Sequence, residues 1–307
     1  MELRKGEHYH KNAIKLNTAR NCFEYVLRTC HYTKVYIPYY TCEVMLEPIQ
    51  KLCVDYEFYH INEKLEPTIL PKLNENEAFL YTNYFGLKQE CVKRLASKYG
   101  NQLIVDNAQA FYAEPLSGID TFYSARKFFG VPDGAYLYTD KPLQQESTQD
   151  YSFERMSHLL KRIDLGAEAG YQDFRKNEGA FCNQEIKKMS KLTEAILCGI
   201  DYEVGKNKRR ENYKQLEEAF GDSNQMHLEM DLISVPMVYP YLLENCEVLK
   251  KKLFENKVFV ATYWPNVFEW CKESEWEYTL AKDTCFLPID QRYGLNEMKQ
   301  LITAIRK

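Results

Sequence analysis

The chain has 307 residues, of which 45% are hydrophobic and 27% are charged, a balance typical of a folded globular protein. Its 40 Lys and Arg residues against 44 Asp and Glu residues give no basic excess of the kind that favours nucleic acid as a partner. No apolar run approaches the length of a membrane span, and the first residues lack the apolar segment of a signal peptide. We therefore expect a cytoplasmic protein with no membrane partner.

The distribution of cysteine and histidine predicts neither a disulfide framework nor a metal site. The ten cysteines form no C-x-x-C pair and lie mostly among apolar residues, as buried free thiols do. The six histidines are scattered along the chain, so we expect no zinc.

Short apolar runs alternate with helical patterns in the first half of the chain. Strands are predicted at 34–37, 54–59, 78–81, 103–105, 121–123 and 135–138. Helices are predicted at 22–30, 42–52 and 90–99. This alternation predicts a mostly parallel sheet with helices on both faces, and such folds bind ligands beyond the carboxyl ends of their strands.

The second half of the chain has a different pattern. Residues 151–220 are mainly helical, with a long helical run over 185–216. A strand at 232–238, a helix at 242–256, a strand at 258–261 and a helix after Gly294 are predicted next, a mixture typical of an α+β layer. We therefore predict a large α/β domain over 1–205 and a small α+β domain over 206–307.

A carboxylate and a lysine follow two of the predicted strands. Asp106 ends the run 103–105, and Lys127 lies between the strand 121–123 and the loop Gly130-Val-Pro-Asp-Gly134. Pyridoxal 5'-phosphate (PLP) needs an anion that keeps its pyridine nitrogen protonated and an amine that forms a Schiff base. Two alternatives remain: Asp106 caps a helix beginning at Ala108, or Lys127 is an ordinary solvated lysine.

Polar neighbours of this pair could also contact such a cofactor. Gln109 lies about one helical turn after Asp106 and could bond the phenolate oxygen of the ring, or it could face solvent. Ser124 could donate its hydroxyl to the phosphate. Arg126 could bind the phosphate or depress the pKa of Lys127.

A second phosphate-binding element is predicted near the amino terminus. With Asn17 or Thr18 as the N-cap of the first helix, the amides of Thr18, Ala19 and Arg20 would present a positive helix end to an anion. Every capped helix has such an end, so the pattern is not specific by itself.

Three further features have two interpretations each. Asn83 could reach the cofactor or substrate, or it could form an ordinary Asn-x-x-Gly turn. Tyr40 could stack on the cofactor ring or pack in the core. The basic run formed by Lys206, Lys208, Arg209 and Arg210 could contact a phosphate or form a solvated helix face.

These segments, in this order, resemble the sugar aminotransferases of the DegT/DnrJ/EryC1/StrS family, which have fold type I of the PLP-dependent enzymes. The resemblance is carried by Asn17-Thr-Ala-Arg-Asn21, Val35-Tyr-Ile-Pro-Tyr-Tyr-Thr-Cys42, Thr82-Asn-Tyr-Phe-Gly86, Val105-Asp-Asn-Ala-Gln109, Ser124-Ala-Arg-Lys127 and Pro132-Asp-Gly134. It implies a large domain with a mostly parallel sheet of the seven-stranded type and a smaller carboxyl-terminal α+β domain.

The resemblance also implies a role for each candidate residue. Lys127 would form the Schiff base and shuttle a proton, Asp106 would pair with the pyridine nitrogen, and Gln109 would hold the oxygen of the ring. Ser124, with the Thr18 and Ala19 segment, would bind the phosphate. The implied protein is a cytoplasmic homodimer that transfers an amino group, usually from glutamate, to a keto sugar nucleotide for surface polysaccharide.

This sequence departs from the family pattern at several positions. Cys42 stands where an aromatic residue often stacks on the cofactor, and Ala135 replaces the second glycine of the usual pair. Lys127 follows Ser124 by only three residues, and the motif of the partner subunit is faint near 170–175. An alternative is therefore a non-catalytic or altered-specificity protein of this fold that binds a sugar or a partner protein.

Overall fold

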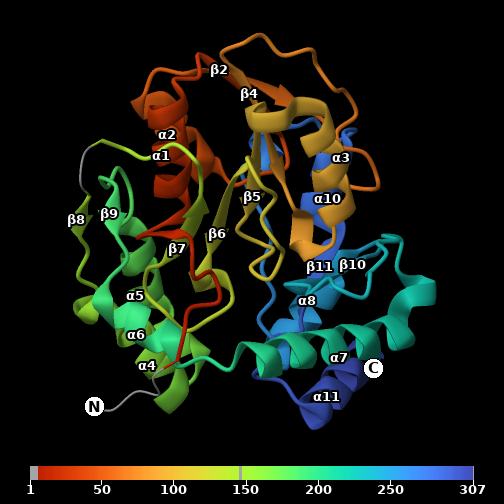
Figure 1. Ribbon diagram of the computed structural model, residues 1–307. Helices are drawn as coiled ribbons and strands as arrows, with labels where there is room; N and C mark the ends of the chain where they lie inside the picture. The colour runs from red at the N-terminus through yellow and green to blue at the C-terminus, as the bar shows by residue number, and fades with distance from the viewer. Residues whose placement is uncertain (1–5, 145–146, 307) are drawn as a thin grey trace.

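The computed structural model describes residues 6–144 and 147–306, which form a large sheet with helices on both faces and a second, two-stranded sheet (Figure 1). The strand order of the large sheet is β3-β2-β4-β5-β6-β7-β1-β9-β8. The strands are β1 (Ile14–Leu16), β2 (Lys34–Pro38), β3 (Asp55–Tyr59), β4 (Glu77–Thr82), β5 (Leu103–Asn107), β6 (Asp120–Ser124), β7 (Ala135–Tyr138), β8 (Thr148–Gln149), β9 (Lys187–Lys188), β10 (Val238–Leu242) and β11 (Thr284–Pro288).

The large sheet is mostly parallel, as predicted. Strands β3, β2, β4, β5 and β6 run in one direction, whereas β7 is antiparallel to both β6 and β1. Strands β8 and β9 at one edge have only two residues each, so the remaining seven strands make up the body of the sheet. The predicted fold class, an α/β fold with a sheet of the seven-stranded type, is confirmed.

The alternation of side chains along the strands explains why helices cover both faces. In β4, Ala78 and Leu80 pack in one apolar cluster with α1 and α2, while Phe79 and Tyr81 pack in the other with α3. Figure 1 shows α1 and α2 on one side of the sheet and α3 on the other. The helices are α1 (Ala19–Cys30), α2 (Leu46–Lys51), α3 (Gln89–Tyr99), α4 (Ser157–Asp164), α5 (Ala167–Gly179), α6 (Lys191–Cys198), α7 (Tyr202–Phe220), α8 (Cys246–Glu255), α9 (Val267–Trp270), α10 (Trp276–Asp283) and α11 (Leu295–Arg306).

The six strands and three helices predicted in the first half are all present, with bounds that differ by a few residues. The predicted long helix over 185–216 is wrong. It is divided into α6 and α7, each with its own cap: Ser190 accepts from the backbone N–H of Thr193, and Asp201 accepts from that of Val204. Both are N-caps, which start a helix because they satisfy first-turn amides that have no acceptor within it.

Two strands predicted in the second half are also wrong. Residues 232–237 form no strand, and the strand begins instead at Val238, where β10 pairs antiparallel with β11. Pro236 has no N–H to donate to a ladder, and Leu232 is 96% exposed. Residues 258–261 follow α8 without strand pairing.

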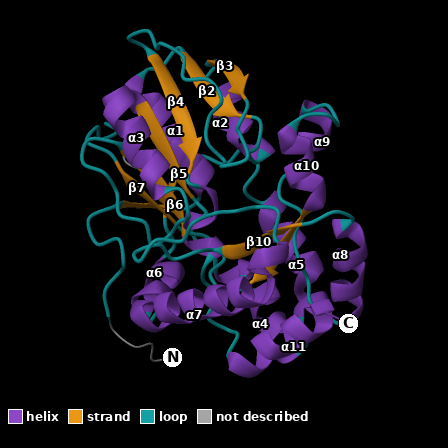
Figure 2. Cartoon of the chain, turned by 90° about the vertical axis from the view of Figure 1, so that its right-hand side faces the viewer, coloured by secondary structure: helices purple, strands orange, loops and turns teal. Residues whose placement is uncertain are grey.

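Helices α7, α8, α10 and α11 pack around the β10–β11 sheet. Figure 2 shows β10, α7, α8 and α11 below the large sheet. Position 205, the predicted domain boundary, lies inside α7, and the division into 1–205 and 206–307 stays a prediction. Within the described ranges, no helix combines the length and apolar character needed to cross a membrane.

Candidate active site

The carboxyl ends of β4, β5 and β6 bring three of the predicted site residues to one edge of the sheet. The parallel register pairs Thr82 with Asp106 and Asp106 with Phe122. Asn83 follows β4, Asp106 lies near the end of β5, and Ser124 ends β6. Lys127 follows Ser124 in a short 3-10 turn, η4 (Ala125–Lys127).

Asp106 is a buried carboxylate with one oxygen still available. It is 6% exposed, and its Oδ1 accepts a hydrogen bond of 2.8 Å from the backbone N–H of Ala108. Burial raises the pKa of Asp106, while the charge of Lys127 and the Ala108 N–H act in the opposite direction. Residues 108–119 form turns and loop with no helix, so Asp106 closes a turn and caps no helix.

Lys127 is exposed and forms no hydrogen bond or ion pair with any residue in the described ranges. It nevertheless lies near the sheet edge, because it follows the end of β6 by three residues, and its charge lowers the pKa of both Asp106 and Cys42. The structure therefore places an unpaired amine beside a buried carboxylate, which are the two groups that the sequence predicted together.

The start of α1 lies against the loop that contains Lys127. The backbone N–H of Gly134 donates to the Asn17 carbonyl at 2.6 Å, and the Gly134 carbonyl accepts from the Ala125 N–H at 3.1 Å. Helix α1 begins at Ala19, earlier than predicted, and its first turn has no acidic residue. Its positive end is therefore available to an anion near Ser124.

Thr18 is the N-cap of α1. Its Oγ1 accepts from the Asn21 N–H at 3.2 Å and donates to the Asn21 side-chain oxygen at 2.7 Å. The amides of Ala19 and Arg20 have no acceptor within the helix, since they belong to its first turn. The Arg20 guanidinium already has an anionic partner, because its Nη1 pairs with Glu47 at 2.6 Å.

Replacing Thr18 with alanine is expected to lower the free energy of unfolding by about 1 kcal/mol, because it removes this cap. Thr18→Ser keeps the hydroxyl and is the matched control. Denaturant unfolding of both variants measures the difference. Equal stability of Thr18→Ala and the wild type would contradict the capping role.

Gln109 is buried, which contradicts the solvent-facing alternative. It is 1% exposed, and its Oε1 accepts from the Phe85 N–H at 3.1 Å. Its Nε2 is also buried but has no hydrogen-bond partner among the described residues. An unsatisfied buried donor is costly, so this amide suits a ligand that brings an acceptor.

Asn83 and Tyr40 have structural roles in the described chain. Asn83 donates to Gln89 and accepts from the Lys88 N–H, each at 2.9 Å, while its own carbonyl accepts from Gly86. Both of its side-chain polar atoms are thus used, which favours the turn alternative. The Tyr40 ring is fully buried and packs edge-on against Trp264, which favours the core alternative.

Arg126 has its partners outside the turn that carries Lys127. It pairs with Glu178, and its guanidinium lies 4.5 Å from the centre of the Phe181 ring. Burial, together with the nearby charge of Arg20, lowers the pKa of Arg126 to about 10. Arg155 approaches the same ring at 5.0 Å.

Arg209 is the main residue whose environment the sequence did not reveal. Together with Lys206, Lys208 and Arg210 it is predicted to contact a phosphate or to lie on a solvated helix face, but it is only 1% exposed. Tyr213, Leu216 and Phe220 lie on the buried face of α7 at helical spacing, and the same spacing places Arg209 on that face. Helical periodicity is therefore the sequence signal that indicates its burial.

The residues at this edge fit PLP. They include a lysine amine without a partner, a free carboxylate oxygen of Asp106, the unsatisfied Gln109 Nε2, the Ser124 hydroxyl and the amides that begin α1. These are the groups that an aldehyde, a pyridine nitrogen, a phenolate oxygen and a phosphate require.

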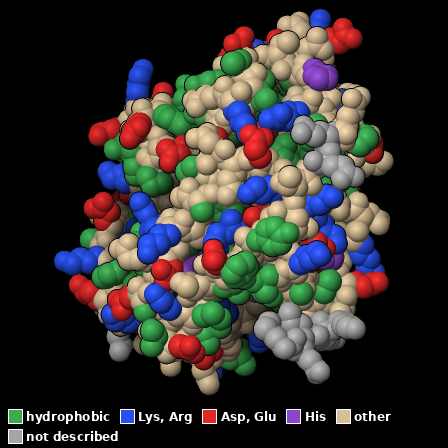
Figure 3. Space-filling model, turned by 90° about the vertical axis from the view of Figure 1, so that its left-hand side faces the viewer, with side chains coloured by type: hydrophobic (Ala, Val, Ile, Leu, Met, Phe, Trp, Pro, Cys, Tyr) green, Lys and Arg blue, Asp and Glu red, His purple; other side chains and the backbone are tan. Residues whose placement is uncertain are grey.

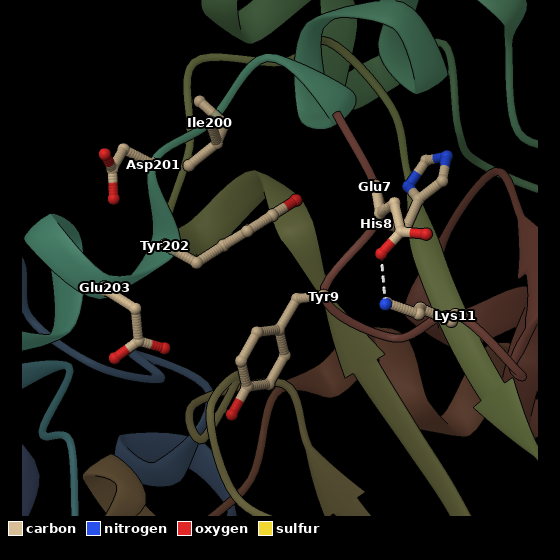
Figure 4. A pocket seen from close by; sticks show the side chains of 8 residues that line it. All are labelled: Glu7, His8, Tyr9, Lys11, Ile200, Asp201, Tyr202 and Glu203. Carbon is tan, nitrogen blue, oxygen red and sulfur yellow. Dashed lines mark ion pairs between the residues drawn. The ribbon is translucent and has the colours of Figure 1, made fainter. Parts of the chain in front are cut away.

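A separate surface hollow of about 400 Å³ lies elsewhere on the molecule. Figure 4 shows residues from two segments on opposite sides of it, with an ion pair between Lys11 and Glu7. Its lining consists of Glu7, His8, Tyr9 and Lys11, together with residues 200–203. None of the candidate site residues lines this hollow.

The order and directions of the strands define an α/β fold of the type found in PLP-dependent aminotransferases of fold type I. The sequence itself matches no protein-family model, and no curated protein matches it significantly. The evidence for the fold comes from solved structures that match over almost the whole chain.

Three solved structures illustrate the match. DesV of S. venezuelae, solved with a ketimine intermediate, has a TM-score of 0.66 at 15% identity, over 96% of this chain and 84% of its own. A DegT DnrJ EryC1 StrS aminotransferase from Brucella abortus gives 0.62 at 14%, over 96% and 85%. The sugar aminotransferase CalS13 from Micromonospora echinospora gives 0.62 at 11%, over 96% and 86%. At these identities the likeness shows that the chain has this fold, as the sequence resemblance implied.

Proposed function

We propose that the protein is a PLP-dependent aminotransferase that transfers an amino group, from glutamate, to a keto sugar nucleotide in surface polysaccharide biosynthesis. The observation that carries this proposal is the unpaired Lys127 beside the buried carboxylate of Asp106, next to the positive end of α1. The matched structures support it, since they include aminotransferases and Spr1654 from Streptococcus pneumoniae in PLP and PMP forms.

Each residue would have a defined task in that site. PLP, when bound, supplies an electron sink for the carbon that carries the amino group. Asp106 would keep the proton on the ring nitrogen, because a carboxylate favours the charged form of a neighbouring base. Gln109 Nε2 would donate to the oxygen of the ring, and Ser124 with the amides of Ala19 and Arg20 would bind the phosphate.

Lys127 would both hold the cofactor and move the proton. Lys127 is exposed, and its Nζ forms no hydrogen bond or ion pair with the described chain. No existing contact must therefore break before the amine reacts. A positioned side chain that transfers a proton accelerates a reaction by about 10²–10⁴-fold. Thr18 would act indirectly, by fixing the first turn of α1 through its bonds to Asn21.

The proposal is tested by adding PLP to the purified protein and recording its visible absorbance. We expect the band of a lysine–PLP Schiff base, its loss on addition of glutamate, and its recovery with a keto sugar nucleotide. A band without any transfer to a panel of keto sugars would support the non-catalytic alternative. No band and no retained cofactor would contradict the enzyme.

We further propose that the enzyme is a homodimer. The α4–α5 hairpin exposes large apolar side chains, including Ile163 at 80% and Leu165 at 71%. Figure 3 shows the face that carries this hairpin, with hydrophobic side chains spread over its lower half. A second copy would cover them, since exposed apolar groups of this size mark interaction surfaces. Light scattering coupled to gel filtration should give twice the 36.3 kDa chain mass, and Ile163→Glu should reduce it.

A further inference from the structure

Arg209 is a charged side chain that the chain buries without a carboxylate partner. It lies in α7, and among the described residues it forms no ion pair. The acidic group that acts most on it, Asp290, is itself paired with Arg292. Burial lowers the pKa of Arg209. A buried cation is costly unless hydrogen bonds compensate, so its contacts are informative.

Those contacts join Arg209 to the loop that carries Lys127. The Arg209 guanidinium carbon lies 4.5 Å from the centre of the Phe128 ring, and Phe128 directly follows Lys127. The Arg209 Nε donates to Gln291 Oε1 at 3.1 Å, and Gln291 Nε2 donates in turn to the Phe128 carbonyl at 2.8 Å. Arg209 therefore contacts the Phe128 ring directly and the Phe128 backbone through Gln291.

A second set of bonds joins Arg209 to the strand edge that carries Gln109. The Arg209 Nη1 donates to the Met237 carbonyl at 2.9 Å. The Met237 N–H donates to the Phe85 carbonyl at 2.8 Å, and the Phe85 N–H donates to Gln109 Oε1 at 3.1 Å. One guanidinium thus connects the segments on which two candidate cofactor ligands depend.

Only an arginine satisfies this environment. The planar guanidinium stacks on Phe128 while its edge donates in two directions, to Gln291 and to the Met237 carbonyl. A lysine ammonium is a point charge that cannot make the stacked and the forked contacts together. The contacts that offset the cost of burying this charge are therefore also the contacts that orient two loops.

We propose that Arg209 is a positioning residue for the candidate active site: through Gln291 and Phe128 it fixes the turn that carries Lys127. The inference rests on the proposed function. It assigns to α7 and to Gln291, both far from Lys127 in the sequence, a role in the orientation of the Lys127 amine. Displacement of a reacting group by about 1 Å can reduce a rate on the order of 100-fold, so a modest shift of this turn is measurable.

The test compares Gln291→Glu and Arg209→Lys with the wild type. Gln291→Glu keeps an acceptor for Arg209 but removes the donor to the Phe128 carbonyl, so it breaks the connection to the lysine turn while Arg209 retains a partner. The readouts are the rate at which the Schiff-base band forms with PLP, the pH at which that band titrates, and the melting temperature. Arg210→Lys is the matched control, because Arg210 also donates to carbonyls, those of Ile233 and Ser234, away from the turn.

We expect both test variants to form the band roughly ten- to 100-fold more slowly and to shift its titration, while Arg210→Lys does neither. Wild-type rates and an unshifted titration in Gln291→Glu would overturn the inference. If Arg209→Lys does not fold, Gln291→Glu alone decides the question. Absence of the band in the wild type would instead contradict the proposed function, so the two failures are distinguishable.

Discussion

Replacing Lys127 with alanine is expected to abolish amino transfer and the Schiff-base band. The amine is the group that would bond the cofactor and transfer the proton, and the second task alone contributes about 10²–10⁴-fold. We therefore expect activity to fall by at least about 10³-fold. Stability should change by less than about 0.5 kcal/mol, because Lys127 is exposed and bonded to no residue of the described chain.

The matched control for this prediction is Lys72→Ala. Lys72 is also exposed and also lacks a hydrogen bond or ion pair within the part of the chain that the structure describes. Steady-state assay and absorbance of both variants give the comparison. Full activity of Lys127→Ala, or equal loss in the two variants, would contradict the assignment of Lys127.

Replacing Asp106 with asparagine is expected to reduce amino transfer on the order of 10²-fold or more while the cofactor stays bound. The amide keeps the shape of the side chain and can still accept from the Ala108 N–H, but it removes the charge that would hold a proton on the ring nitrogen. Because burial already raises the pKa of Asp106, the ionised carboxylate is unfavourable where it lies, so the free energy of unfolding should not fall.

Asp120→Asn is the matched control for Asp106→Asn. Asp120 is 7% exposed, and burial raises its pKa too, but it lies at the opposite end of a neighbouring strand, at the start of β6. Assays should show full activity in Asp120→Asn. A similar loss in both variants would mean that the effect of Asp106 is structural.

The elements that the sequence predicted best are those whose pattern is local. Strands β4 to β7 are almost wholly buried and consist of short runs rich in apolar residues, so the sequence predicts them near their observed bounds. Asp106 and Lys127 were found because each follows such a strand. Strands β1, β8 and β9 have two or three residues, too few for any periodic signal.

Other outcomes depend on contacts with distant parts of the chain. Tyr40 is a core residue because Trp264 packs on its ring, and Arg209 is buried because Phe128 and Gln291 surround it. The Lys206–Arg210 run has the composition of a solvated helix face, and only the tertiary fold shows that Arg209 is the buried basic residue among them. The strand predicted at 232–238 is wrong because the apolar residues that favour it are not buried in a sheet, and Ile233 is 63% exposed.

The central claim, that Lys127 is the residue that bonds PLP, has one direct test. The protein is incubated with PLP, reduced with borohydride and digested, and its peptides are sequenced by mass spectrometry. The account predicts one phosphopyridoxyl adduct, on Lys127, in the wild type and in Lys72→Ala. An adduct on a different lysine, or none after reduction, would contradict it.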